Sequence, residues 1–422
     1  MKILHGDILF SESPERLSIH ENSYIGIENG CVLSIWDRVP EQYAGIPVTD
    51  HGRNLIIPAF SDLHIHAPQY AQRGTGMDLL LSDWLNTYTF PEEAKFTDTE
   101  YARVIYTQLA DNMLRNGTFH AAVYATLHVP ASRILAEIME KKGLRGYVGK
   151  VNMDVNSPEY LCEDTKRSLH DAEDFVASFA SGSPVKPILT PRFAPTCSRE
   201  QICGLGRIAA KYGCGMQSHI VESRWEAAEA VRLFPECTCD TEIYEKAGLL
   251  DNGPNLLGHF IFPSEADISI AKKHACTAVH CPDATSNVIA GIAPVHALMN
   301  MGVSLAIGTD IGAGQSPAVY RQAASAVRLS KLKEFYEGDT NPAVTFPMAF
   351  YMATKGGGSV FEKTGSFEKG YRFDALVLKD LEDEGTRLSP QDRLERFCYI
   401  GDDRNIAAGY IGGEAAVLSP EK

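Results

Sequence analysis

Four histidines and one aspartate stand at positions where their side chains could bind one metal ion together. His64 and His66 flank a single residue at the end of the segment PAFSDLHIH. A strand would place both imidazoles on the same side, because side chains alternate with a period of two. His219, His259 and Asp310 each follow a further apolar run. Zinc and iron both accept imidazole and carboxylate ligands, so the five residues predict a site for one divalent ion of either kind.

Each of these residues also has a plain structural interpretation. The His64 and His66 pair is a weak signal by itself and suits hydrogen-bonded or surface histidines equally well. His219 and His259 could be hydrogen-bonded core residues, and Asp310 could cap the helix that follows it. The metal hypothesis therefore depends on a fold that brings all five residues to one place.

Glu222 lies three residues after His219, just beyond the expected end of a strand. Its carboxyl group could face the metal site and transfer protons without binding the ion. Alternatively, it is a solvated glutamate in the first turn of the next helix, where the helix dipole favours a negative charge. His280 also ends an apolar run and is a further candidate to line the site.

The middle of the chain alternates strand-type segments with amphipathic ones. Residues 99–115 and 198–212 have the amphipathic helical pattern, and the second begins at a candidate N-cap, Ser198, and ends at Gly213. Eight strand–helix units predict a parallel (β/α)8 TIM-type barrel, in which chemistry lies at the C-terminal ends of the strands. The eight expected strands are LIIPAF (55–60), TFHAAVYA (118–125), LRGYVGKV (144–151), VKPILT (185–190), CGMQSHI (214–220), NLLGHF (255–260), CTAVH (276–280) and SLAIGTD (304–310).

Both ends of the chain show short strand patterns instead. Asn29-Gly30 is a strong signal for a two-residue hairpin turn. FDALVL and AAGYIGGEAAVL near the C-terminus are also of strand type. We therefore expect a small β domain built from residues 1–57 and 366–422, and a barrel domain of residues 58–365.

Composition limits the classes of function. With 422 residues, 44% hydrophobic and 22% charged, the chain is of ordinary globular type. The formal net charge of −15 argues against a nucleic-acid partner. Residues 284–309 carry no charged side chain, but interrupting polar residues favour a buried loop, helix and strand over a membrane span. Ten scattered cysteines and the absence of a signal-peptide pattern predict reduced thiols in the cytoplasm.

Two glycine-rich segments do not fit the nucleotide-binding motifs that they superficially match. GLGRIA (204–209) falls inside a predicted helix, whereas a dinucleotide fingerprint lies at a strand-to-helix turn. KGGGS (355–359) lacks the P-loop pattern and suits close packing of helices.

The histidine pattern, with GTD after the last expected strand, resembles the amidohydrolase superfamily. Within it, HIHAPQY, DWLNTYTFPEE, TPRFAPTCS and QSHIVES are similar to the guanine deaminase family. The resemblance spans nearly the whole chain and is most specific in residues 58–93 and 190–222. It implies a metal-dependent hydrolase that converts the purine base guanine to xanthine and ammonia, with one ion per chain, zinc favoured over iron, and a homodimeric assembly.

The resemblance also implies a role for each residue of the site. The metal ligands would be His64, His66, His219, His259 and Asp310. Glu222 would shuttle protons, Asp310 would accept the proton of the attacking water, and His259 would also stabilise developing charge. The residues that contact the purine would be Gln69, Arg192 and Phe193.

Other interpretations stay open at this point. The substrate could be another aminated ring, such as cytosine, an adenosine derivative, 8-oxoguanine or a triazine. Arg192 would distinguish guanine, because a guanidinium only donates hydrogen bonds and suits a carbonyl oxygen rather than an amino group. It could instead pair with an acidic neighbour inside the barrel mouth. A barrel scaffold without metal or activity is the non-enzyme alternative.

Overall fold

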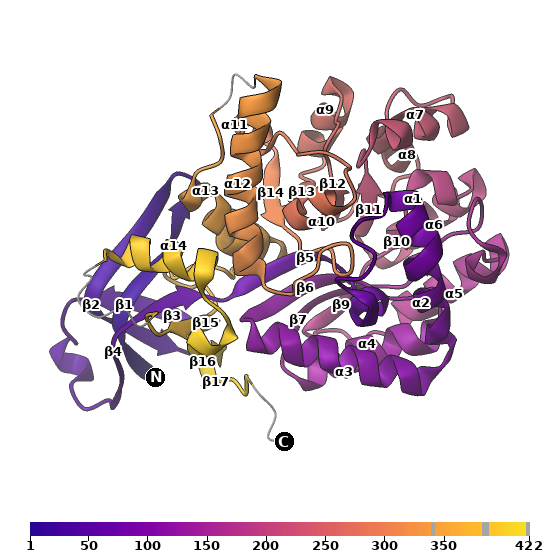
Figure 1. Cartoon of the computed structure of the whole chain (residues 1–422). Coiled ribbons are helices and arrows are strands. Elements are labelled where there is room, and N and C mark those ends of the chain that lie inside the picture. The colour runs from indigo at the N-terminus through magenta and orange to yellow at the C-terminus, as the bar shows by residue number, and fades with distance from the viewer. Residues whose placement is uncertain (339–341, 382–387, 419–422) are drawn as a thin grey trace.

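Short parallel strands, each followed by helical segments, form the body of the chain (Figure 1). The computed structural model describes residues 1–338, 342–381 and 388–418. Two four-stranded parallel sheets have the orders β5-β6-β7-β9 and β11-β12-β13-β14, and β8 and β10 form a short pair. The strands are β5 Phe60–His66, β6 Thr118–Tyr124, β7 Arg145–Gly149, β8 Val151–Asn152, β9 Val185–Pro187, β10 Thr190–Pro191, β11 Met216–Ile220, β12 Asn255–His259, β13 Thr277–His280 and β14 Ser304–Ile307.

Backbone contacts close the two sheets into one barrel. On one side, Asp310 N donates to His64 O at 2.7 Å and so joins the loop after β14 to β5. On the other side, Leu189 forms a parallel bridge with Met216 of β11. The predicted parallel (β/α)8 barrel is confirmed.

The interior of the barrel is filled with side chains. Residues from five strands and from the segment after β9 belong to one buried apolar cluster: Leu63, Ala122, Ile188, Leu256, Val279 and Ala306. Such a barrel has no open channel, so a ligand can bind only where the strands end.

Helices surround the barrel and have the expected ends. α3 Thr99–Arg115 matches its predicted range. In α6 Arg199–Tyr212 the Ser198 side chain accepts a hydrogen bond from Gln201 N, and Gly213 ends the helix at φ 64°. The other helices are α1 Leu81–Trp84, α2 Phe90–Glu93, α4 Val129–Lys141, α5 Thr165–Ala177, α7 Arg224–Leu233, α8 Asp240–Lys246, α9 Glu265–Lys273, α10 Pro282–Asn287, α11 Val295–Asn300, α12 Val319–Glu337, α13 Phe346–Tyr351 and α14 Pro390–Ile400.

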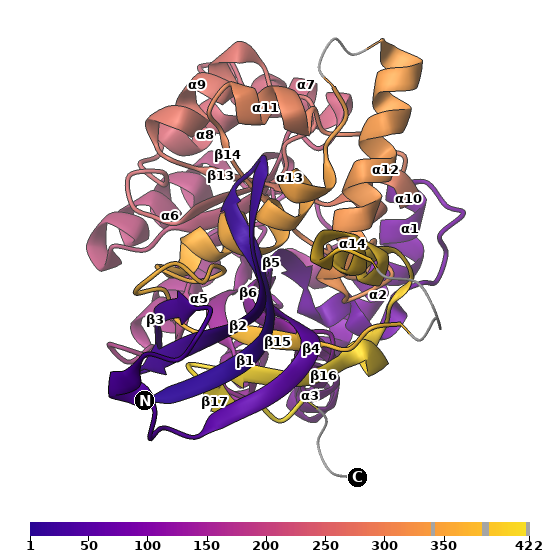
Figure 2. The same cartoon turned by 90° about the vertical axis from the view of Figure 1, so that its left-hand side faces the viewer.

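A separate sheet combines strands from both ends of the chain (Figure 2). Its order is β17-β16-β15-β4-β1-β2-β3. The predicted Asn29-Gly30 turn joins β2 to β3, with φ values of 51° and 76°. The strands are β1 Lys2–Ser13, β2 Arg16–Glu28, β3 Cys31–Trp36, β4 Val48–Pro58, β15 Ala375–Leu378, β16 Ile406–Ile411 and β17 Glu414–Ala415. The division of the chain at residues 57 and 366 stays a prediction.

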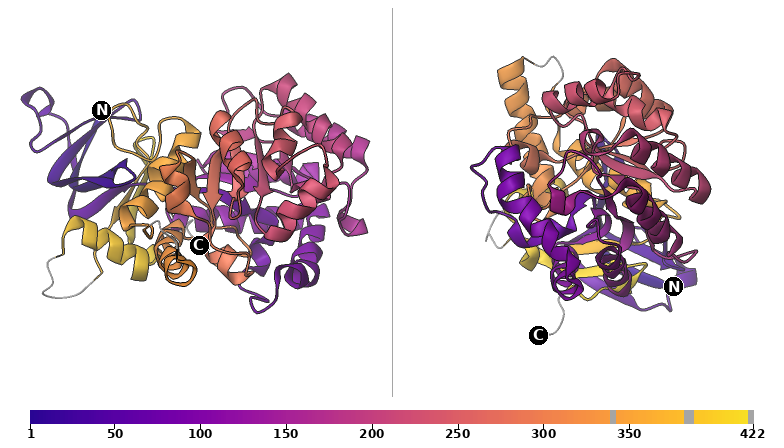
Figure 3. Two further views of the ribbon diagram at one scale, coloured as in Figure 1. Left: turned by 90° about the horizontal axis from the view of Figure 1, so that it is seen from above. Right: turned by 90° about the vertical axis from the view of Figure 1, so that its right-hand side faces the viewer.

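The terminal sheet lies at one side of the barrel (Figure 3). α14 joins the two parts. Its Arg393 NH1 donates to Asp7 Oδ2 of β1 at 2.7 Å. On the barrel side, the rings of Phe397 and Tyr320 of α12 are 4.6 Å apart.

Two expected strands are placed differently in the structure. The expected first barrel strand, residues 55–60, is wrong in position, because Leu55–Pro58 ends β4 of the terminal sheet and pairs with β15. The barrel strand begins only at Phe60. Buried strands of both sheets are equally apolar, so the local pattern cannot separate them. The fourth expected strand, residues 185–190, is interrupted after Pro187, which has no N–H to donate.

Several other segments have the local structure that the sequence predicts, whereas the reduced state of the cysteines stays a prediction. The uncharged residues 284–309 contain most of α10 together with α11 and β14. In the described ranges, no helix is both long and apolar enough to cross a membrane. Residues 204–209 lie inside α6. A Cβ atom on Gly356 would lie 2.7 Å from Leu305 O, which agrees with close packing at KGGGS. All ten cysteines are free thiols.

Candidate functional site

The five predicted ligands converge at the C-terminal end of the barrel. His66 Nε2 lies 3.0 Å from His219 Nε2 and 3.3 Å from Asp310 Oδ1. His64 Nε2 is 3.5 Å from Asp310 Oδ1, and His259 Nε2 is 3.9 Å from Asp310 Oδ2. Two overlapping groups of three donors result, one of His64, His219 and His259 and one of His64, His66 and Asp310.

A register shift in β5 lies next to its two histidines, His64 and His66, and affects their orientation. The pairing of β5 with β6 shifts between Asp62 and Ile65. At this place Asp62 Oδ1 accepts hydrogen bonds from His64 N at 3.2 Å and from Thr309 N at 2.9 Å. Burial raises the pKa of Asp62 to about 7, against the opposing effect of the hydrogen bonds from Thr309. Asp62 thus ties β5 to the loop that carries Asp310, a function that the strand pattern did not reveal.

Strained backbone marks the strand ends that carry the site. Val221, His259, Phe260 and Asp310 have φ values of 47°, 67°, 48° and 48°. Residues other than glycine rarely adopt this left-handed region, and such strain clusters at functional sites.

Glycines make room for the His64 imidazole. A Cβ atom on Gly258 of β12 would lie 2.7 Å from His64 Cε1, and one on Gly308 would lie 2.5 Å from His64 Cβ. Contacts of this length do not occur between such atoms, so a side chain at either position would displace His64.

The three histidines of β5 and β11 are neutral in this environment. Burial lowers the pKa of His64, His66 and His219 well below the usual range, and the neighbouring histidines lower it further. His219 Nδ1 donates to the carbonyl oxygen of Arg192 at 2.6 Å, because that oxygen can only accept. His219 Nε2 therefore carries a lone pair directed at the cluster.

These donors fit a divalent cation. His64 Nε2 is buried and has no hydrogen-bond partner among the described residues. A zinc-like ion with ligands at about 2.0–2.2 Å places neighbouring ligand atoms about 2.8–3.6 Å apart for bond angles between about 90° and the tetrahedral angle. The separations of 3.0, 3.3 and 3.5 Å between His66, His219, His64 and Asp310 atoms agree with that spacing.

Glu222 lies beside the cluster but outside both donor groups. Its Oε2 is 3.8 Å from His259 Nε2, and its side chain is 13% exposed. Its backbone N donates to Glu226 Oε2 at 2.8 Å. Burial and the negative charge of Asp310 raise the pKa of Glu222, while His259 opposes the shift. Glu222 precedes Ser223, the N-cap of α7, so it is not a solvated residue of that helix.

Asp310 is also a weaker acid than a solvated aspartate. Burial raises its pKa to about 6, although the neighbouring His259 and Arg192 oppose the shift. At neutral pH the group is mostly ionised but is more basic than an ordinary carboxylate.

Arg192 and Gln69 are joined through Glu93, a residue that the sequence interpretation did not single out. Arg192 NH1 donates to Glu93 Oε2 at 2.7 Å, and Gln69 Nε2 donates to Glu93 Oε1 at 2.8 Å. The acidic partner considered for Arg192 is therefore present. Phe193 follows Arg192 in extended backbone and is half-buried. The motif TFPEE contained the signal for Glu93, but nothing local showed where its side chain would point.

Two further residues lie at the site. The ring of Tyr124, at the end of β6, is 4.7, 4.6 and 5.1 Å from the rings of His64, His66 and His219. The sequence interpretation missed it. His280 ends β13 as expected, and burial, together with the neighbouring His259, lowers its pKa to about 3.

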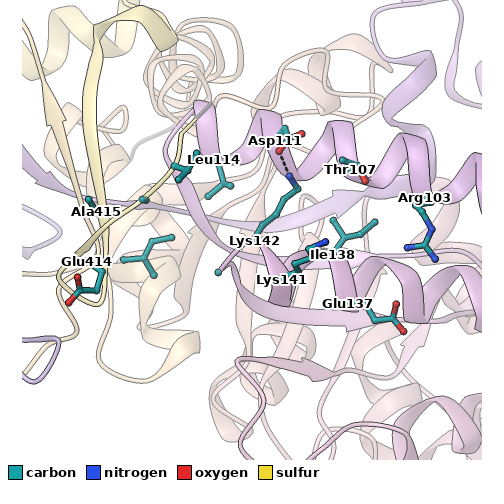
Figure 4. Close-up of a pocket in the computed structure, with 14 residues that line it drawn as sticks. Arg103, Thr107, Asp111, Leu114, Glu137, Ile138, Lys141, Lys142, Glu414 and Ala415 are labelled. Carbon is teal, nitrogen blue, oxygen red and sulfur yellow. Dashed lines mark hydrogen bonds and ion pairs between the residues drawn. The ribbon is translucent and has the colours of Figure 1, made fainter. Parts of the chain in front are cut away.

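A separate cleft of about 840 Å³ lies between α3, α4 and the last strands (Figure 4). Lys142 of this cleft forms an ion pair with Asp111 of α3. Its lining includes none of the residues predicted for chemistry, so it is distinct from the candidate site.

Known proteins match this chain along nearly its whole length. A model of the amidohydrolase family matches residues 55–416. Guanine deaminase of Dictyostelium discoideum is 34% identical over 444 residues, which cover 98% of this chain and 97% of that protein. A crystal structure of guanine deaminase from C. acetobutylicum, with guanine bound in its active site, is 41% identical, has a TM-score of 0.95 and covers 99% of this chain and 100% of that one. The structure of E. coli guanine deaminase is 27% identical, with a TM-score of 0.89 and 100% of both chains covered.

Proposed function

The chain belongs to the amidohydrolase family, and on that premise we propose that it deaminates guanine to xanthine and ammonia with one divalent metal ion. It is a hydrolase that acts on carbon–nitrogen bonds, and guanine deaminases match it over most of its length. One observation carries the proposal: a cluster of side chains that could bind a metal ion and a buried arginine lie at the same end of the barrel. The two are connected by the hydrogen bond of 2.6 Å from His219 Nδ1 to the backbone oxygen of Arg192.

The proposed ligands are His64, His66, His219, His259 and Asp310, with zinc favoured over iron. The neutral state of the first three imidazoles supports this assignment, because only an unprotonated nitrogen can bind a cation. When bound, such a cation is a Lewis acid that brings the pKa of water to about 7 and thus supplies the nucleophile.

The carboxyl groups of Asp310 and Glu222 would transfer the protons of the reaction. Asp310 would accept a proton from water as the oxygen adds to the amine-bearing carbon of guanine. Glu222 would donate a proton to a ring nitrogen and then, as a carboxylate, take the proton of the new hydroxyl group as the carbonyl of xanthine forms. The proton on Asp310 would pass to the amine, so that the carbon–nitrogen bond breaks and ammonia leaves. The raised pKa of Glu222 supports its part as the donor. His259, 3.8 Å from Glu222 and 3.9 Å from Asp310, would stabilise the charge that develops.

Arg192, Gln69 and Phe193 would recognise the purine. Guanine has a carbonyl oxygen where adenine has an amino group, and the guanidinium of Arg192 can only donate. Gln69 would bind another edge of the ring, and the half-buried Phe193 would form an apolar wall.

The assembly and location of the enzyme are part of the same proposal. We propose a homodimer, as the family resemblance implies, that acts in the cytoplasm. Ten free thiols suit a reducing compartment, which supports the location.

The test is the ultraviolet spectrum of guanine incubated with the purified protein, with metal analysis of the same sample. We expect conversion to xanthine and close to one zinc or iron per chain. A protein that carries metal but leaves guanine unchanged would overturn the substrate assignment. A protein that is silent and free of metal would favour the scaffold alternative.

A further inference from the structure

The buried carboxylate of Glu93 connects Gln69 and Arg192, the two polar residues proposed to recognise the purine. Glu93 is the last residue of α2, which follows the π-helical turn η3 Leu85–Thr89. Its Oε1 accepts from Gln69 at 2.8 Å and its Oε2 from Arg192 at 2.7 Å. The side chains of Glu93 and Arg192 are only 8% and 7% exposed.

We propose that Glu93 is a positioning residue that holds Arg192 and Gln69 as one recognition unit for the purine. The inference rests on the proposed function, because that function assigns the two residues to guanine. Glu93 itself would not touch the reacting atoms.

The first reason is electrostatic. A guanidinium this far from solvent needs a negative partner, and a carboxylate also fixes the plane in which its donors lie. The ring of Phe90, on the same short helix, lies 5.5 Å from Arg192 Cζ and limits its movement further. In the part of the chain that the structure describes, NH1 is occupied by Glu93, while no protein acceptor is recorded for Nε or NH2 of Arg192. Donors held in advance bind a carbonyl oxygen without a cost of reorganisation.

The second reason concerns the Gln69 amide. Its Nε2 donates to Glu93, and its Oε1 accepts from Gly312 N at 3.1 Å. A carboxylate can only accept and a backbone N–H can only donate, so the two contacts together define which way the amide points. One N–H and one lone pair of Gln69 remain for a ligand.

The chain contains a matched control on the same helix. Glu92 is 7% exposed as a residue, close to the 6% of Glu93. Its carboxylate binds Lys95 at 2.6 Å and the hydroxyl of Tyr101 instead. Glu92→Gln therefore removes a similarly buried charge without changing a contact of Arg192 or Gln69.

The experiment is a double-mutant cycle on the metal-loaded full chain. The proteins are the parent, Glu93→Gln, Arg192→Met and the double variant, with Glu92→Gln as control, and the readouts are kcat and KM for guanine and metal content. We expect Glu93→Gln to lower kcat/KM at least about tenfold, mainly through KM, since it weakens charge-assisted hydrogen bonds. Metal content should stay unchanged. In the Arg192→Met background the same substitution should cost clearly less than in the parent, because only the contact of Glu93 with Gln69 is left to lose. Glu92→Gln should stay near the parent.

Several results would overturn the inference. A parent-like KM and kcat for Glu93→Gln would refute it while the proposed function stood. Independent, additive losses in the cycle would show that Glu93 does not act through Arg192. If Glu93→Gln fails to fold, Glu93→Asp takes its place, because it keeps the charge but is too short to span both partners, and a parent-like KM would then refute the inference. A parent that does not hydrolyse guanine refutes the proposed function itself, and the inference falls with it.

Discussion

Glu222→Gln is the substitution that tests the proposed proton transfer most directly. The amide has the size of the carboxyl group but cannot shuttle a proton. The structure gives reasons to expect little other change, because the backbone N of Glu222 is held by Glu226 at 2.8 Å. Its side chain belongs to neither group of metal donors, and its nearest recorded contact with a ligand is 3.8 Å, to His259.

The expected loss follows from the role. General acid–base catalysis is typically worth about 10²–10⁴-fold, which corresponds to about 2.7–5.4 kcal/mol in the activation barrier. We expect the loss in kcat, with KM for guanine near that of the parent and close to one metal ion per chain.

The assay is steady-state conversion of guanine to xanthine at pH 7, with metal analysis of each protein. Glu229→Gln on α7 is the control, because Glu229 forms a surface ion pair with Arg232 at 2.6 Å and lies outside the donor cluster. Parent-like turnover of Glu222→Gln would refute the reasoning. A loss of metal in parallel with activity would show that Glu222 holds the ion instead of moving protons.

Four further predictions concern the metal, the substrate and the fold. Dialysis against a strong chelator should abolish activity, which about one equivalent of zinc or ferrous ion per chain should restore; activity without metal would contradict the five-ligand site. Arg192→Met should lower kcat/KM for guanine at least about tenfold with metal content unchanged, and equal turnover would make the residue purely structural. Gly258→Ala should reduce metal content, because the added Cβ would lie 2.7 Å from His64 Cε1; a full complement of metal would contradict this. His120 Nε2 and Asp374 Oδ2 form a buried polar pair 2.9 Å apart. Asp374→Asn breaks this pair and should therefore lower the free energy of unfolding in urea by about 3–5 kcal/mol at pH 7. Burial raises the pKa of Asp374, but the hydrogen bond with His120, the charge of Arg372 and the hydrogen bond from Gly412 N together hold the pKa below the ordinary value. The contribution is therefore fully present above about pH 3.9 and lost as the pH falls through the folded pKa, and an unchanged urea midpoint at pH 7 would contradict it.

Much of the fold could be predicted because its signals are local. Ser198 caps the start of α6 because its side chain accepts a hydrogen bond from the first turn, and Gly213 ends the helix because glycine readily adopts a positive φ. Asn29-Gly30 turns the chain because both residues tolerate positive φ. The candidate ligands His219, His259 and Asp310 could be chosen from the sequence because a parallel barrel brings the C-terminal ends of its strands to one end of the barrel.

Other features required contacts between distant parts of the chain. The apolar run that ends at Pro58 suited either sheet, and only the pairing of β4 with β15 decided between them. The side chain of Asp62 accepts hydrogen bonds from the backbone N and the hydroxyl of Thr309, 247 residues away, and no local pattern predicts that contact.

The amino-acid sequence by itself determined which residues could bind a metal, because ligand chemistry and strand periodicity are properties of short segments. Only the tertiary structure decided the environment of the residues that would read the substrate. Glu93 and Arg192 are 99 residues apart. No pattern in the sequence around either residue predicts that the carboxylate of Glu93 joins Arg192 to Gln69. The direction of a side chain on a short helix above a barrel mouth depends on how the loops pack, and that packing depends on many long-range contacts at once.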